Sequence, residues 1–348
     1  MSDSSWLWAV FTLIAAAAQT VRNATQRSLT ASLGTVGATH VRFLFGVPFA
    51  FVFLAGVMLA LGRDLPQPGL VFVPWILDGA LAQIAATALM LAAMGERSFV
   101  VTIAYIKTEP VQVALFGLIL LGDVVTLPMA IAILIATSGV VVMSLKPGAM
   151  TGGPARNQAE WKPVSRPDCA PTQEVRARIA DKFTQSAQAR LLSAKPVPTF
   201  ADRARPTLLG LGAGAMFGLS ATGYRGAILS LNDQSFVMAA TFTLTAGLAL
   251  QTIVLTFYLW LRERSVLVAI FRAWRPSLFA GFMGALASQF WFLAFALATA
   301  ASVRTLALVE VLFAQAISRF FFGQPTSERE GFGIVLIVLG VALLMWVY

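Results

Sequence analysis

The hydrophobic positions of this sequence lie in long runs that are separated by short polar stretches. Because an α-helix rises about 1.5 Å per residue, about twenty apolar residues cross the hydrocarbon layer of a bilayer. The pattern therefore predicts an all-α polytopic membrane protein with ten transmembrane helices. The predicted spans are residues 7–30, 37–60, 70–94, 99–121, 127–145, 207–230, 236–261, 277–298, 302–322 and 331–348.

Composition supports this pattern and narrows the chemistry. Hydrophobic residues fill 58% of the 348 positions and charged residues only 12%, whereas about a quarter of the residues of a soluble domain are charged. The single histidine, His40, and the single cysteine, Cys169, leave too few ligands for a zinc site. A phosphate loop of the form GxxxxGKS/T does not occur, so ATP hydrolysis is not expected. We expect no cofactor.

A polar segment at residues 146–206 divides the hydrophobic sequence into two halves, 1–145 and 207–348. It is rich in proline and carries eleven basic against five acidic residues, as a solvated linker does. Within residues 172–194, apolar residues recur at roughly helical spacing beside basic ones; they are Val175, Ile179, Phe183 and Leu191. This pattern is typical of a helix lying on an anionic lipid surface. A loose linker explains the same composition, and both interpretations stay open.

The two halves resemble each other. A shift of 201 positions places Glu109 on Glu310, and a shift of 203 in the first span of each half places Arg22 on Arg225. The first shift also superposes glycines, namely Gly122 on Gly323 and Gly139 on Gly340. Charges are rare inside a span, so the superposed charges carry the argument. Each half has five spans, an odd number, which predicts two inverted five-helix repeats of the kind found in secondary transporters.

Basic residues are distributed unevenly between the loops. The face that includes the linker holds its eleven basic residues and six further arginines, whereas the opposite face, with both termini, offers only Arg63 outside the spans. Basic loops remain in the cytoplasm. We therefore expect a multi-pass protein of the cell inner membrane, with the linker in the cytoplasm and both termini outside.

Charges inside the spans identify candidate substrate-binding residues. Glu109 and Glu310 lie about ten residues into their spans, where inserting a charge costs about 2.5–3.5 kcal/mol, so we expect both to point into the helix bundle. Pro110 removes an amide donor and is expected to break its helix, which frees backbone groups at mid-membrane depth. Lys107 can pair with Glu109 on one face only if this helix is broken.

Other polar residues have two possible roles. Arg22 and Arg225 either line the solute pathway or extend to the lipid headgroups. Snorkelling or ion pairing is the ordinary role of four residues nearer to span ends, His40, Arg42, Arg304 and Arg319, of which only Arg304 is retained as a candidate. Four residues near the middle of spans are expected either to pack against other helices or to contact the solute, namely Gln83, Tyr105, Gln289 and Trp291. The predicted substrate-binding set is Arg22, Gln83, Tyr105, Lys107, Glu109, Arg225, Gln289, Trp291, Arg304 and Glu310.

Residues 108–143 and 309–345, with the segment 40–50, resemble the EamA-type transporters of the drug/metabolite transporter superfamily. The shared pattern is a long helix, a glycine turn and a last helix with a glycine near its middle, in each half. The resemblance implies ten helices around a central solute cavity, with alternating access. The usual glycine–glutamate turn is altered, because Asp123 follows the first turn glycine and Gln324 the second. The linker is long for this family, and the charge-based orientation is opposite to the usual one.

A secondary carrier is the leading hypothesis. Its cavity is expected to be lined by the third, fourth, eighth and ninth spans, with parts of the first and sixth. The cations of the predicted set outnumber its two glutamates, which favours an anionic or zwitterionic metabolite. A channel and a membrane scaffold are the alternatives, and an intramembrane enzyme is less favoured because the usual protease motifs are absent. We expect a small-molecule substrate and membrane lipid as partners, no nucleic acid, and a monomer.

Overall fold

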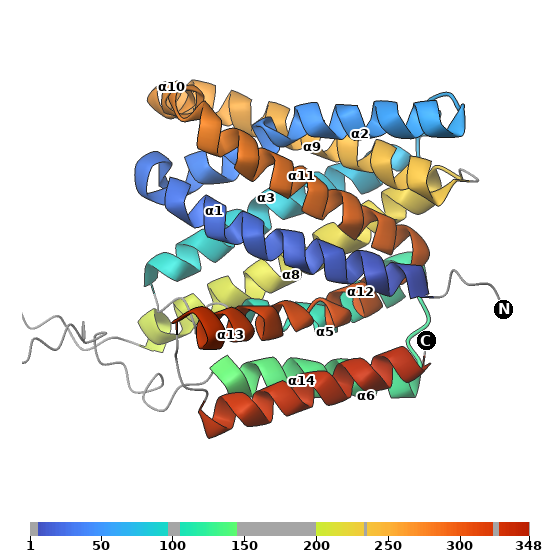
Figure 1. Cartoon of the computed structure of the whole chain (residues 1–348), viewed down its shortest axis with the longest axis vertical. Coiled ribbons are helices and arrows are strands. Elements are labelled where there is room, and N and C mark those ends of the chain that lie inside the picture. Colours follow the sequence, from blue (N-terminus) through green and yellow to red (C-terminus); the bar gives the residue numbers. More distant parts are fainter. Residues whose placement is uncertain (1–5, 97–104, 145–199, 233–234, 323–326, 348) are drawn as a thin grey trace, which may run out of the picture. The chain divides into compact units, whose positions relative to one another are not determined.

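The computed structural model describes residues 6–96, 105–144, 200–232, 235–322 and 327–347, and every regular element in this part of the chain is helical. The first half contains α1 (Leu7–Leu44), α2 (Gly46–Leu61), α3 (Phe72–Glu96), α5 (Glu109–Phe116) with a π-helical extension (Gly117–Leu121), and α6 (Leu127–Ser144). The second half contains α8 (Phe200–Ser230), α9 (Phe236–Arg262), α10 (Arg264–Arg272), α11 (Trp274–Leu297), α12 (Ala300–Leu306), α13 (Val309–Phe322) and α14 (Glu328–Val347). The predicted all-α class is confirmed (Figure 1).

The two hydrophobic halves, Met1–Pro147 and Pro206–Tyr348, form one compact unit. Most of the linker lies outside the described residues, including Cys169 and the expected lipid-binding segment at 172–194. The domain boundaries predicted from the sequence therefore stay predictions.

Several helices are suited to a bilayer. Those long and apolar enough to cross it are Val36–Leu61, Phe72–Met90, Phe236–Arg262, Trp274–Leu297 and Glu328–Val347. Shorter apolar helices are Leu7–Arg22, Glu109–Leu121 and Leu127–Met143. Each of the ten predicted ranges holds a described helix. The ten-span count and the inverted relation of the halves stay predictions.

The boundary between the first two spans differs from the expected loop at residues 31–36. The helix α1 continues to Leu44, and its course changes at a single non-helical residue, Gly34, with φ 67° and ψ 179°. Residues that have a Cβ atom rarely adopt a positive φ, whereas glycine adopts it readily. Glycine at position 34 therefore permits this change of direction. A sequence pattern of two apolar runs cannot distinguish such a kink from a loop.

The fourth and ninth predicted spans are both interrupted. In the fourth, the helix is broken at residues 107–108, and α5 begins at Glu109 with Pro110 in its first turn. In the ninth, α12 ends at Leu306 and α13 begins at Val309. The shift of 201 positions brings the two breaks to within one residue of each other. Proline accounts for the first break, as expected, whereas the matched position of the second half has no proline.

The helices α6 and α14 lie side by side and cross very closely (Figure 1). A Cβ atom built on Gly139 would lie 2.7 Å from the carbonyl oxygen of Gly333, and one on Gly340 would lie 2.6 Å from the backbone nitrogen of Ala136. Real Cβ atoms do not approach backbone this closely. The superposed glycines Gly139 and Gly340 therefore occupy the same kind of position, one on each helix of this crossing.

A second close approach involves α8 and the broken fourth span. Gly210, Gly214 and Gly218 repeat every four residues along α8. A Cβ on Gly210 would lie 2.7 Å from Tyr105 Cβ, and one on Gly214 would lie 3.1 Å from the carbonyl oxygen of Ile106. Small residues let helix backbones approach in this way. The stripe therefore holds α8 against the segment in which the helix is interrupted.

The short helix α10 lies between two predicted spans and was not expected. It buries Ile270, and Val266 and Leu267 pack beside it, while Phe271 is exposed. Arg264 and Arg272 stand at its ends. A helix with one apolar and one basic side is typical of the lipid–water boundary.

Candidate solute-binding site

The described part of the unit contains a cavity of about 190 Å³. Its walls come from α1, α3, α5, α8, α9, α11, α12 and α13, and both helix breaks reach it. The expected lining by the third, fourth, eighth and ninth spans is present. In addition, Arg42 of the second span and three residues of α9, in the seventh, contribute to it. These extra walls follow from the packing of α1 and α9 against α11.

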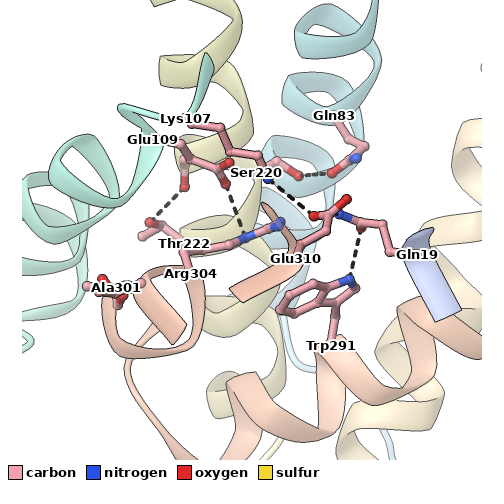
Figure 2. A network of polar contacts seen from close by, with 12 residues as sticks. Gln19, Gln83, Lys107, Glu109, Ser220, Thr222, Trp291, Ala301, Arg304 and Glu310 are labelled. Carbon is pink, nitrogen blue, oxygen red and sulfur yellow. Dashed lines mark hydrogen bonds and ion pairs between the residues drawn. The ribbon is translucent and has the colours of Figure 1, made fainter. Parts of the chain in front are cut away.

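One chain of polar contacts joins residues that line this cavity (Figure 2). The Lys107 Nζ atom lies 3.2 Å from Glu310 Oε2, and the side-chain amide of Gln19 donates to the same oxygen at 2.9 Å. The indole N–H of Trp291 donates in turn to Gln19 Oε1 at 3.1 Å. These contacts join the break of the fourth span, α1, α13 and α11.

A second ion pair lies beside the first. The Nε atom of Arg304 is 3.1 Å from Glu109 Oε1. The guanidinium carbon of Arg304 lies 4.9 Å from the ring centre of Trp291 and 5.5 Å from that of Phe295. A cation over an indole face is attracted by the ring, so Trp291 belongs to both chains of contacts.

Each of the two ion pairs connects one half of the chain to the other. Glu109 of the first half pairs with Arg304 of the second, and Glu310 of the second half pairs with Lys107 of the first. Both glutamates lie in the first turn of a helix that follows a break. The N-terminal end of a helix carries a partial positive charge, which stabilises a carboxylate there. The interrupted helices therefore place two carboxylates at the cavity and join the halves through them.

Comparison with known proteins agrees with this architecture. Residues 205–346 match the EamA-like transporter family. The family resemblance predicted from the sequence is confirmed over this second half. Together with the apolar helices, this match over the second half supports a multi-pass membrane protein.

Solved structures share the fold of the whole chain. One crystal structure, titled only as that of a protein, aligns with 97% of this chain and 99% of its own chain, with a TM-score of 0.59 and 16% sequence identity. At this identity the likeness concerns the fold alone. No curated protein sequence is significantly similar to the chain.

The structure brings most of the predicted site residues together. Those that line the cavity are Arg22, Gln83, Lys107, Glu109, Trp291, Arg304 and Glu310. Gln83 accepts a hydrogen bond from Ser220 at 2.8 Å, which fixes its amide against α8. The expectation that both glutamates point into the bundle agrees with their positions, because each is mostly buried beside the cavity.

Three predicted residues do not line the cavity. Arg225 donates to the carbonyl oxygens of Phe295 and Ala298 at the end of α11 and lies 3.3 Å from Asp123. The last carbonyls of a helix lack amide partners, so Arg225 satisfies them. Tyr105 packs against Gly210 of α8, and the Gln289 side chain donates to Thr241 at 2.8 Å.

Two residues for which snorkelling or ion pairing was expected are buried inside the unit. His40 is fully buried and forms a hydrogen bond with Thr256 at 3.0 Å, between α1 and α9. Arg42 lines the cavity. Both lie on α1 beyond the kink at Gly34. The sequence does not show that this part of α1 packs inside the bundle.

Several polar residues of the cavity were missed by the sequence reasoning. They are Gln19, Arg42, Thr87, Tyr224, Gln251 and Ser288. Gln19 and Gln251 are glutamines inside apolar spans. A glutamine in such a span is the signal that identified Gln83, and it identifies these two residues as well. Arg42 was considered in the sequence and assigned to snorkelling or ion pairing. Thr87, Tyr224 and Ser288 have no such signal, because threonine, serine and tyrosine occur in many spans as packing residues.

Proposed function

We propose that the protein is a secondary transporter that moves a small polar or amphipathic metabolite through this cavity by alternating access. The observation that supports this most is that two ion pairs connect the halves, each at an interrupted helix. Discontinuous helices that meet at a polar site inside a bundle are typical of secondary transporters. Intramembrane charges placed in this way mark solute or ion pathways.

The ion pairs also indicate how the cavity would open. Motion of one half against the other changes the distance from Lys107 to Glu310 and from Arg304 to Glu109. Both pairs must therefore loosen or re-form when access changes from one side of the membrane to the other. A solute that competes for these charges would lower the cost of that step, which couples binding to the conformational change.

Transport is tested with the purified protein in proteoliposomes. A carrier gives uptake that saturates with solute concentration and shows exchange of internal for external solute. A channel gives flux without saturation, a scaffold gives none, and an enzyme converts the solute. A carrier with Glu310→Gln is expected to lose most of its uptake while keeping its fold, because Lys107 then loses its partner. Unchanged uptake by this variant would contradict the role assigned to the ion pairs between the halves.

Proton coupling is proposed as the energy source, through Glu109 or Glu310. Uptake by the wild type should then respond to an imposed pH gradient, and Glu109→Gln should make the same uptake insensitive to the gradient. A response that is equal in both proteins would exclude Glu109 as the coupling group, and the corresponding change at Glu310 would then be compared.

The orientation is proposed from the basic loops, with the linker in the cytoplasm and both termini outside. The chain offers a direct test, because its single cysteine, Cys169, belongs to the linker. A maleimide that cannot cross membranes should label Cys169 in opened cells but not in intact cells. Labelling of intact cells would place the linker outside and reverse the orientation.

A further inference from the structure

The charges around the cavity do not balance. Among the lining residues that the structure describes, the cations are Arg22, Arg42, Lys107 and Arg304, and the acids are Glu109 and Glu310. The two ion pairs join Lys107 and Arg304 to the two acids. The described lining therefore has a net charge of +2, whichever way its members pair. Charge kept away from water is costly unless an opposite charge accompanies it.

Arg22 and Arg42 lie at one place on the cavity wall. They belong to the parts of α1 before and after the kink at Gly34. A Cβ atom built on Gly284 of α11 would lie 3.2 Å from Arg42 Cγ and 3.6 Å from Arg22 Cδ. Both arginine stems therefore pass over this one glycine. Ser288, one turn further along α11, lines the cavity as well.

One donor of Arg42 lacks a partner in the part of the chain that the structure describes. Its Nε atom is buried and has no hydrogen-bond partner among the described residues. Its guanidinium carbon lies 4.9 Å above the ring of Phe43, which leaves the planar edge of the group for other partners. A guanidinium carries five donors in a fixed fork, which matches two oxygens of a carboxylate or a phosphate.

We propose that Arg22 and Arg42, above Gly284, form an oxyanion subsite, and that the solute is a small organic anion held there through its carboxylate or phosphate oxygens. The transport part of this proposal rests on the proposed function, whereas the binding part does not. The cavity of about 190 Å³ is smaller than the pockets of about 300–1,000 Å³ that hold drug-sized ligands. The solute is therefore a small metabolite.

A purely structural role for Arg42 has a different consequence. If its charge stabilised the fold, Arg42→Gln would lower the melting temperature of the ligand-free protein. As a binding group, Arg42 adds to an unbalanced charge and opposes folding until an anion is bound. The melting temperature of ligand-free Arg42→Gln should therefore be no lower than that of the ligand-free wild type. A functional site that costs stability behaves in this way.

Equilibrium binding to the full chain in detergent, at constant ionic strength, tests the proposal. The probes are succinate, glycerol 3-phosphate, alanine and putrescine, which separate carboxylate, phosphate, zwitterion and cation. We expect succinate or glycerol 3-phosphate to bind and to raise the melting temperature, and the other two not to. Arg42→Gln should weaken this binding at least about thirtyfold, because it removes one partner of a buried charge pair. Arg264→Gln, at an exposed site on α10, is the matched control and should bind as the wild type does.

A second variant keeps both charges. In Gly284→Ala the new methyl group displaces the Arg42 stem, so anion binding should weaken several-fold although the net charge is unchanged. Binding of alanine or putrescine alone, or equal anion binding by wild type and Arg42→Gln, would overturn the oxyanion subsite. Saturable uptake of a neutral or cationic solute without anion binding would overturn the subsite but leave the transporter in place. Anion binding without transport of any probe would support the subsite and contradict the transporter.

Discussion

The pair of Arg304 and Glu109 allows a quantitative prediction. The two side chains are 15% and 11% exposed and their nearest charged atoms are 3.1 Å apart, so solvent screens them weakly. Replacing Arg304 by glutamine leaves a buried carboxylate without this cation, and breaking a buried pair costs about 3–5 kcal/mol. The variant also loses the contact of Arg304 with the Trp291 ring. We expect the free energy of unfolding to fall by about 3 kcal/mol.

The double variant Arg304→Gln, Glu109→Gln separates the pair from its members. Removing the orphaned carboxylate should recover most of the loss, so the two single effects should exceed the double effect by about 2 kcal/mol, within the usual range for residues in contact. Unfolding is measured by titrating sodium dodecyl sulfate into detergent micelles and fitting the free energy of unfolding. The exposed variant Arg264→Gln is the control and should change it by less than about 0.5 kcal/mol. Additive effects of the two replacements would refute the argument, because they would mean that the charges do not interact.

Three further predictions concern residues of known surroundings. Gly340→Ala should lower the free energy of unfolding by about 2 kcal/mol relative to Gly331→Ala, because only the first methyl group meets backbone across the helix crossing, and the same titration measures the difference. Trp291→Phe removes the hydrogen bond to Gln19 and should cost roughly 1 kcal/mol and lower the uptake rate in proteoliposomes; unchanged uptake would contradict its place in the site. Arg225→Gln should destabilise the protein, as seen by a lower melting temperature, yet leave the solute concentration at half-maximal uptake unchanged, since Arg225 lies away from the cavity.

The sequence reasoning was most successful where one residue type has one favoured environment. A glutamate in an apolar span has few options besides the bundle interior, so Glu109 and Glu310 could be assigned to a polar site before the structure was known. The break at Pro110 follows from the missing amide of proline. The break between α12 and α13 has no such residue and could not be found in this way. Arginine is harder to place, since its long stem reaches either the headgroups or the interior.

The sequence by itself determined the helical class, the family resemblance and the candidate charges, because hydrophobic run length and the cost of burying charge are local properties. Only the tertiary structure decided which charges meet. Lys107 and Glu310 are far apart in the chain, and their contact depends on how two interrupted helices pack. The same packing separated two arginines that the internal repeat had made equivalent. Arg22 lines the cavity, whereas Arg225 lies near the end of α11. A side chain's role depends on the neighbours that packing provides, and sequence spacing does not specify them.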